Sequence, residues 1–268
     1  MTTIIAGSGI ITNPNSIKLF TPSIEMPPLL IKGNFKRSIA SLVDISGAGA
    51  LFNLAGTSTG NVTFDDEGVF VTKTNGLETN VLATEAISIY SVHKQGDLTY
   101  DILNAIPFND GSQNTTGSGY GTYFLERYPR GSGDTQINGM YATGYVYWDS
   151  TPSANRTGLQ NAQQNVEKGD FVFRMMVIDP VSYTATIYSG YKGVLTKDVT
   201  QIPHDLAARV RTTPLRVGYA PNSSAISGAS PALRIAEFGA YNGACTDKQA
   251  AKAYTESRAL QALSGITI

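Results

Sequence analysis

The segment Met140–Asp149, which reads MYATGYVYWD, carries the densest run of side chains able to recognise a ligand. Alternation along a β-strand places one set of them on a common face: Tyr141, Thr143, Tyr145, Tyr147 and Asp149. Tyrosine rings can stack on sugar rings, and phenol hydroxyls with a carboxylate can bond sugar hydroxyls. The pattern therefore predicts a glycan-binding face formed by Tyr141, Tyr145, Tyr147 and Asp149. A plainer interpretation is that tyrosines suit any half-buried pleated surface.

Acidic residues do not form the pattern that sugar cleavage requires. Retaining glycoside hydrolysis uses two carboxyl groups about 5 Å apart, which two acids alternating on a strand could supply. The sequence has no such pair, and Asp65-Asp66-Glu67 is instead typical of a tight acidic turn. We therefore predict no catalytic residues and a protein that is not an enzyme.

Metal and cofactor chemistry has little support either. The single cysteine, Cys245, excludes an intramolecular disulfide and a thiolate cluster, and His93 and His204 are far apart in the sequence. Cys245 itself best fits a small buried residue. The segment Asn109–Asn114 offers oxygen ligands but lacks the spaced carboxylates of a calcium loop, so an exposed loop is the better interpretation. We predict no metal site and no cofactor.

Composition narrows the class of protein. Of the 268 residues, 41% are hydrophobic and 15% are charged, and the charged fraction is well below the usual level of about a quarter. The formal net charge of −1 creates no field that attracts nucleic acid or anionic lipid. The sequence contains no apolar run of about 18 residues, the length that predicts a membrane span. The N-terminal residues also lack the basic start of a signal peptide. We expect a protein assembled in a cytoplasm, with export by a non-classical route as the alternative.

The first 37 residues differ from the rest of the chain. They contain four basic residues, one acid (Glu25) and four of the twelve prolines. The pair Pro27-Pro28 is incompatible with a helix interior or a central strand. We predict an extended N-terminal arm over residues 1–37 and a β-sandwich over residues 38–268. The alternative, in which the first segment belongs to the sandwich, fits the pattern equally well.

Short apolar segments separated by turn-forming runs continue from Ile39 onward and indicate an all-β domain. The best-defined hairpin joins Phe171–Ile178 to Tyr183–Tyr188. The first of these strands is apolar on both faces except at Arg174, which predicts a central, buried strand. Asp179 and Pro180 have the residue types of the turn between them.

One helix is predicted, at the C-terminal end. Thr246 and Gln249 form a capping box, and Asp247 complements the positive end of the helix dipole. Helical spacing predicts one buried face, formed by Ala250, Ala253, Tyr254, Ser257 and Leu260.

The C-terminal third carries a strand-and-helix motif. It consists of Ile235, Glu237, Phe238, Ala240, Tyr241 and Asn242, then Thr246-Asp247-Lys248-Gln249, with Pro214–Gly218 as the preceding short strand. This motif resembles the laminin G-like branch of the concanavalin A-like jelly-roll superfamily. The resemblance implies an all-β, two-sheet antiparallel jelly-roll sandwich with one short C-terminal helix. The glycosidases of this superfamily carry a Glu-x-Asp-x-Glu or Glu-x-Asp-x-x-Glu strand motif, which this sequence lacks.

Three functional hypotheses follow. The favoured one is a non-enzymatic virion protein of a bacteriophage, such as a tail-fibre, spike or capsid-decoration subunit, with glycan contact as a further role. Its partners would be other virion proteins or copies of itself, bound through the arm, and host surface glycan. The first alternative is a free carbohydrate-binding lectin, and the second is a glycosidase with an unrecognised site.

Overall fold

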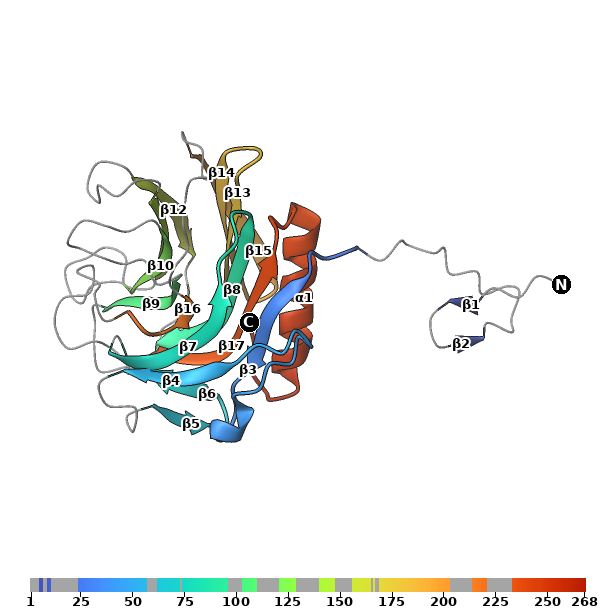
Figure 1. Ribbon diagram of the computed structural model, residues 1–268, viewed down its shortest axis with the longest axis vertical. Coiled ribbons are helices and arrows are strands. Elements are labelled where there is room, and N and C mark those ends of the chain that lie inside the picture. The colour runs from blue at the N-terminus through green and yellow to red at the C-terminus, as the bar shows by residue number, and fades with distance from the viewer. Residues whose placement is uncertain are drawn as a thin grey trace.

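The computed structural model describes a two-sheet antiparallel β-sandwich with one C-terminal helix, as the sequence predicted (Figure 1). The described residues are 5–6, 9–10, 24–56, 62–72, 74–95, 103–109, 121–128, 140–147, 156–164, 166, 169–202, 214–220 and 233–268. In 5–6, 9–10, 95, 103–106, 121–128, 140–147 and 156–164 the description covers the backbone alone.

One sheet has seven strands in the order β12-β11-β10-β9-β16-β7-β4. Their bounds are β4 Phe52–Gly56, β7 Asn75–Leu82, β9 Leu103–Asn109, β10 Gly121–Tyr128, β11 Met140–Tyr147, β12 Arg156–Gln164 and β16 Pro214–Val217. Every pairing is antiparallel. The sheet therefore joins strands from the first and last thirds of the chain.

The second sheet has eight strands, seven of them in the order β15-β14-β13-β8-β17-β6-β5. The eighth, β3 (Leu29–Asn34), pairs with β17 beyond the end of β6. The other bounds are β5 Thr63–Asp65, β6 Gly68–Val71, β8 Ile87–Gln95, β13 Val172–Asp179, β14 Thr184–Tyr191, β15 Val194–Gln201 and β17 Leu233–Asn242. Outside the two sheets lie the pair β1 Ile5–Ala6 and β2 Gly9–Ile10, the 3-10 turn Ile39–Ser41 and the helix α1 Asp247–Ala262.

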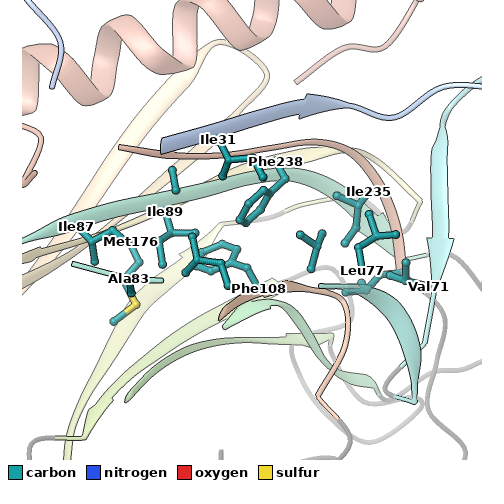
Figure 2. Close-up of a cluster of buried hydrophobic side chains, with 14 of the residues drawn as sticks. Ile31, Val71, Leu77, Ala83, Ile87, Ile89, Phe108, Met176, Ile235 and Phe238 are labelled. Atoms are coloured by element: carbon teal, nitrogen blue, oxygen red, sulfur yellow. The ribbon is translucent and has the colours of Figure 1, made fainter. Parts of the chain in front are cut away.

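The eight-stranded sheet is buried on both faces along its central strands, β8, β13, β14 and β17. Its inner face packs on the seven-stranded sheet through side chains such as Ile89, Met176 and Phe238, with Phe108 and Leu77 opposite (Figure 2). Its outer face lies under α1, where a second apolar cluster includes Tyr90, Phe173 and Tyr254. The molecule thus has three layers, and the middle one has the continuous apolar character that the sequence predicted for the Phe171 strand.

The predicted hairpin is confirmed. Asp179 accepts hydrogen bonds from the backbone N–H of Val181 (2.9 Å) and of Ser182 (3.3 Å), which fixes the turn. The return strand continues to Tyr191, three residues beyond the predicted end. Arg174, the one basic residue of β13, is buried as well, opposite Ser91 and Ser189 on the neighbouring strands.

The predicted capping box of the helix is also confirmed. The Thr246 hydroxyl accepts a bond from the Gln249 N–H (3.4 Å), and the Gln249 side chain accepts one from the Thr246 N–H (2.7 Å). Four of the five residues predicted on the inner face are buried, but the fifth position was wrong because Gln261 is buried where Leu260 was expected. The Glu237 carboxylate below the helix explains this exchange, because it accepts a hydrogen bond from the Gln261 side chain.

The N-terminal boundary of the sandwich differs from the sequence prediction. β3 lies inside the segment 1–37 that was predicted as an arm, and its Ile31 is buried in the core between the sheets. Residues just before β3 also contact the helix, since Gln249 donates to the Glu25 carbonyl (2.6 Å). Pro27-Pro28 is compatible with this placement because both prolines precede the strand. The sandwich therefore includes residues from Ile24 onward, and an arm over residues 1–23 stays a prediction.

A buried carboxylate, Glu237 of β17, binds several elements together. Its side chain accepts hydrogen bonds from the Tyr90 hydroxyl (3.0 Å), the Ser257 hydroxyl (3.0 Å) and the Gln261 amide (2.9 Å). The Lys32 ammonium lies 3.3 Å from the same carboxylate. These contacts connect β17 to β8, β3 and α1, and they account for the buried Gln261.

Replacement of Glu237 should destabilise the fold strongly. Glu237→Ala would leave the buried Tyr90, Ser257 and Gln261 groups without their acceptor, so we expect the free energy of unfolding to decrease by about 3–5 kcal/mol. Glu237→Gln, which keeps one carbonyl acceptor, should decrease it less. Urea denaturation measures both values. The control is Glu256→Ala on the exposed face of α1, expected to change stability by less than about 0.5 kcal/mol, and an equal loss in the control would contradict this assignment.

The buried tyrosines predict a loss of stability at high pH. Burial, with the Glu237 charge beside it, raises the pKa of Tyr90 well above 10, whereas a tyrosine in the unfolded chain ionises near 10. The folded state therefore disfavours the phenolate, and its stability should fall as the pH rises above about 10. In Tyr90→Phe the decline measured by denaturation between about pH 9 and pH 11 should be shallower than in the wild type. An equal slope in the two proteins would argue against this origin.

Candidate functional site

The three predicted site tyrosines lie in one strand. Tyr141, Tyr145 and Tyr147 belong to β11, which pairs with β10 on one side and β12 on the other. Their alternate positions in an uninterrupted register with β10 place them on one face of the seven-stranded sheet. The fourth predicted residue, Asp149, lies outside the described residues.

A row of polar positions crosses the seven-stranded sheet at Tyr145. In register, Tyr145 is opposite Tyr123 of β10, which is opposite Asn109 of β9. Across the following strands the same row continues through the residues that pair next, namely Arg216 of β16, Glu78 of β7 and Asn53 of β4. We call Asn53, Glu78, Arg216, Asn109, Tyr123 and Tyr145 the polar row.

The polar row occupies the outer face of the sheet. The adjacent row in the same register includes Leu77, Val217 and Phe108, which are buried in the core between the two sheets. Because successive residues of a strand face opposite sides, the described side chains of the row, those of Asn53, Glu78, Arg216 and Asn109, face away from that core. The row that contains Tyr145 therefore extends, through the register, to positions on five further strands.

Arg216 is the centre of the described part of this row. Its Nε donates to Oε2 of Glu78 at 2.7 Å, and the guanidinium carbon lies 5.1 Å from the centroid of the Tyr219 ring. The side chains of Arg216 and Glu78 are 17% and 33% exposed, so solvent reaches both of them. A guanidinium held between a carboxylate and an aromatic ring has a fixed orientation.

Asn109 extends the same arrangement. Its side-chain amide donates to the Tyr219 carbonyl at 2.9 Å, and the residue is 1% exposed. Asn109 is therefore the buried last residue of β9, and the prediction that it begins an exposed loop was wrong. The remainder of that predicted loop, residues 110–114, lies outside the described residues.

Sequence reasoning missed Glu78, Arg216 and Asn53. Each stands at a polar position of a short alternating strand, and this signal is visible in the sequence. What could not be read was the order of the strands, because β16 inserts between β9 and β7. That insertion brings Arg216 opposite Glu78, from which it is separated by 138 positions along the chain.

The acidic turn and the cysteine have structural roles. Asp65 and Glu67 form ion pairs with Arg234, and Glu67 also contacts the Lys94 ammonium at 2.8 Å. These contacts attach the β5–β6 turn to β17 and β8. Cys245 is buried, as predicted, and its burial raises the thiol pKa. A raised pKa makes a thiol less reactive, so the position beside the helix start does not activate it.

Within the described ranges, no group of three or more His, Cys, Asp or Glu side chains is placed to hold a metal ion. His93 is buried in β8 with its Nδ1 2.9 Å from the Ser91 hydroxyl, and His204 lies outside those ranges. No helix in the described part of the chain is both long and apolar enough to cross a bilayer.

Comparison with known proteins gives a fold but no family. No family model matches the chain, and no curated protein sequence matches it. Solved structures do match, among them the botulinum neurotoxin serotype D binding domain, with 14% identity and a TM-score of 0.57 over 85% of this chain. The type G receptor-binding domain matches with 12% identity and a TM-score of 0.54 over 86% of this chain.

The match extends over part of each neurotoxin domain. This chain spans about half of their length, namely 52% of the serotype D domain and 51% of the type G domain. A serotype D ligand-binding domain in complex with N-acetylneuraminic acid also matches, with 13% identity, a TM-score of 0.56 and coverage of 85% of this chain and 51% of that one. At such identities the similarity shows a shared β-sandwich fold, in agreement with the jelly-roll resemblance of the sequence.

Proposed function

We propose that this chain is a non-enzymatic attachment module that binds glycans on the outer face of its seven-stranded sheet. The observation that carries the proposal is the polar row, in which Glu78, Arg216 and Asn109 continue in register into Tyr123 and Tyr145. Sugar recognition requires flat surfaces for stacking together with oriented donors and acceptors. The row supplies donors and acceptors on three strands, at Asn53, Glu78 and Arg216, whereas Asn109 is buried and bonds the Tyr219 carbonyl.

The environment of Arg216 suits such a role. Its guanidinium is already held by Glu78 at 2.7 Å and lies over the Tyr219 ring. Little conformational entropy is then lost when a ligand hydroxyl bonds to this group, because its orientation is set beforehand. Supporting context comes from the neurotoxin binding domains of the same fold, one of which was solved with N-acetylneuraminic acid.

The proposal excludes sugar cleavage on the chemistry of the row. Among its described side chains the one carboxylate is Glu78, which is bonded to Arg216. Glycoside hydrolysis commonly uses two carboxyl groups that flank the scissile bond. Glu78 therefore serves better as an acceptor for sugar hydroxyls.

Substitution of the β11 tyrosines tests the proposed function. In Tyr145→Ala and Tyr147→Ala we expect retention on a glycan array to fall about five-fold or more, because stacking on an aromatic ring contributes roughly 1 kcal/mol or more per contact. The melting curve should stay close to that of the wild type. Tyr183→Ala is the matched control, because this tyrosine is exposed in the β13–β14 turn of the other sheet. Glycan retention that is unchanged in both β11 variants would refute the proposal.

The finer assignment, to a bacteriophage virion, is proposed on sequence grounds alone. It gives residues 1–23 the role of the attachment or oligomerisation segment, since the sandwich itself begins by Ile24. Light scattering on full-length protein and on residues 24–268 tests this role. We expect the full-length chain to form an oligomer and the shortened chain to be a folded monomer. If the full-length and shortened proteins had the same oligomeric state, residues 1–23 would not be an oligomerisation segment, and a free lectin would be favoured.

A further inference from the structure

The charges of the polar row are balanced within the row itself. Arg216 and Glu78 are directly opposite each other on adjacent antiparallel strands, and one hydrogen bond of 2.7 Å joins them. Their described neighbours in the row, Asn53 and Asn109, carry no charge. The described part of the row therefore carries no net charge and presents an oriented ion pair.

This balance disfavours acidic sugars. A sialic or uronic acid carboxylate that bonded to Arg216, whether beside Glu78 or in its place, would lie close to a second carboxylate. Because both side chains are partly buried, with 17% and 33% exposure, solvent weakens this repulsion less than at an open surface. Displacement of Glu78 would also leave that carboxylate without its Arg216 bond.

The same groups suit the hydroxyls of neutral sugars. An ionised carboxylate accepts hydrogen bonds through two oxygens, which together offer about four lone-pair directions. The Arg216 bond uses Oε2 of Glu78, so a pair of adjacent sugar hydroxyls can donate to this carboxylate without disturbing the ion pair. Asn53, exposed and directly opposite Glu78, adds an amide that both donates and accepts.

We infer that this face selects neutral glycans with adjacent free hydroxyls and discriminates against sialylated and other acidic ones, with Glu78 as the specificity-determining residue. The inference rests on the proposed glycan-binding function and adds the chemical class of the ligand. It also separates this chain from the N-acetylneuraminic acid complex known for a protein of the same fold.

Matched pairs of oligosaccharides test the inference, for instance lactose beside sialyllactose, at about 0.15 M ionic strength. For every pair of which the full-length wild type binds at least one member, we expect it to bind the neutral member at least ten-fold more tightly than the sialylated one. Glu78→Gln removes the repelling charge and releases Arg216 from it, so the ratio of neutral to sialylated affinity should fall at least five-fold. Glu256→Gln on α1 makes the same change in net charge away from the row and should leave the ratio unchanged.

A second variant changes the ratio in the opposite direction. Asn53→Asp adds a negative charge at an exposed position of the row and should increase discrimination against the sialylated member. It keeps the test decisive if Glu78→Gln fails to fold. The inference would be overturned if the wild type preferred the sialylated member, or if the variants left the ratio unchanged. Either result would leave the proposed glycan-binding function intact. Binding of neither member of any pair would refute the proposed function itself.

Discussion

The structure depends on one buried carboxylate, Glu237, which lies in a sheet that is covered on both faces. Glu237 is fully buried in β17, the strand that pairs with β8, β6 and β3. A buried carboxylate is tolerated when its oxygens are bonded and a counter-ion is near, and here Tyr90, Ser257, Gln261 and Lys32 meet that requirement. Since these four groups come from β8, α1 and β3, the carboxylate determines where the helix and the first sandwich strand must lie.

The close fit of the helix layer follows from the same constraint. A Cβ on Gly190 would approach the Tyr254 ring to 2.4 Å, so only glycine allows α1 to lie this near β14. The Tyr254 hydroxyl in turn accepts a bond from the N–H of Gly193 at 3.0 Å. The outer face of the eight-stranded sheet is thus occupied by the helix, and in the proposed function it is the outer face of the other sheet that meets a ligand.

An element could be predicted from the sequence when the contacts that stabilise it join residues close together in the chain. The hairpin at Asp179 and the capping box at Thr246 depend on contacts within a few residues, and both could be read directly. The buried Gln261 could not, because its partner Glu237 lies on another element and the apolar period alone favoured Leu260. The arm boundary failed for a similar reason. The prolines before β3 indicated an irregular segment, but the pairing of β3 with β17 joins opposite ends of the chain.

The sequence predicted candidate residues on one strand, β11, and missed the positions in register with them on the other strands. Alternation predicted which residues of β11 share a face, since that depends on strand geometry alone. The residues that complete the row come from β4, β7, β9, β10 and β16, and the order of these strands in the sheet differs from their order in the chain. Every member of the row therefore acquires its neighbours only when the whole sheet has formed. Recognition by such a surface is thermodynamically linked to global folding, so a true ligand of this face must raise the melting temperature as its concentration increases, and no short peptide from the chain can reproduce the interaction.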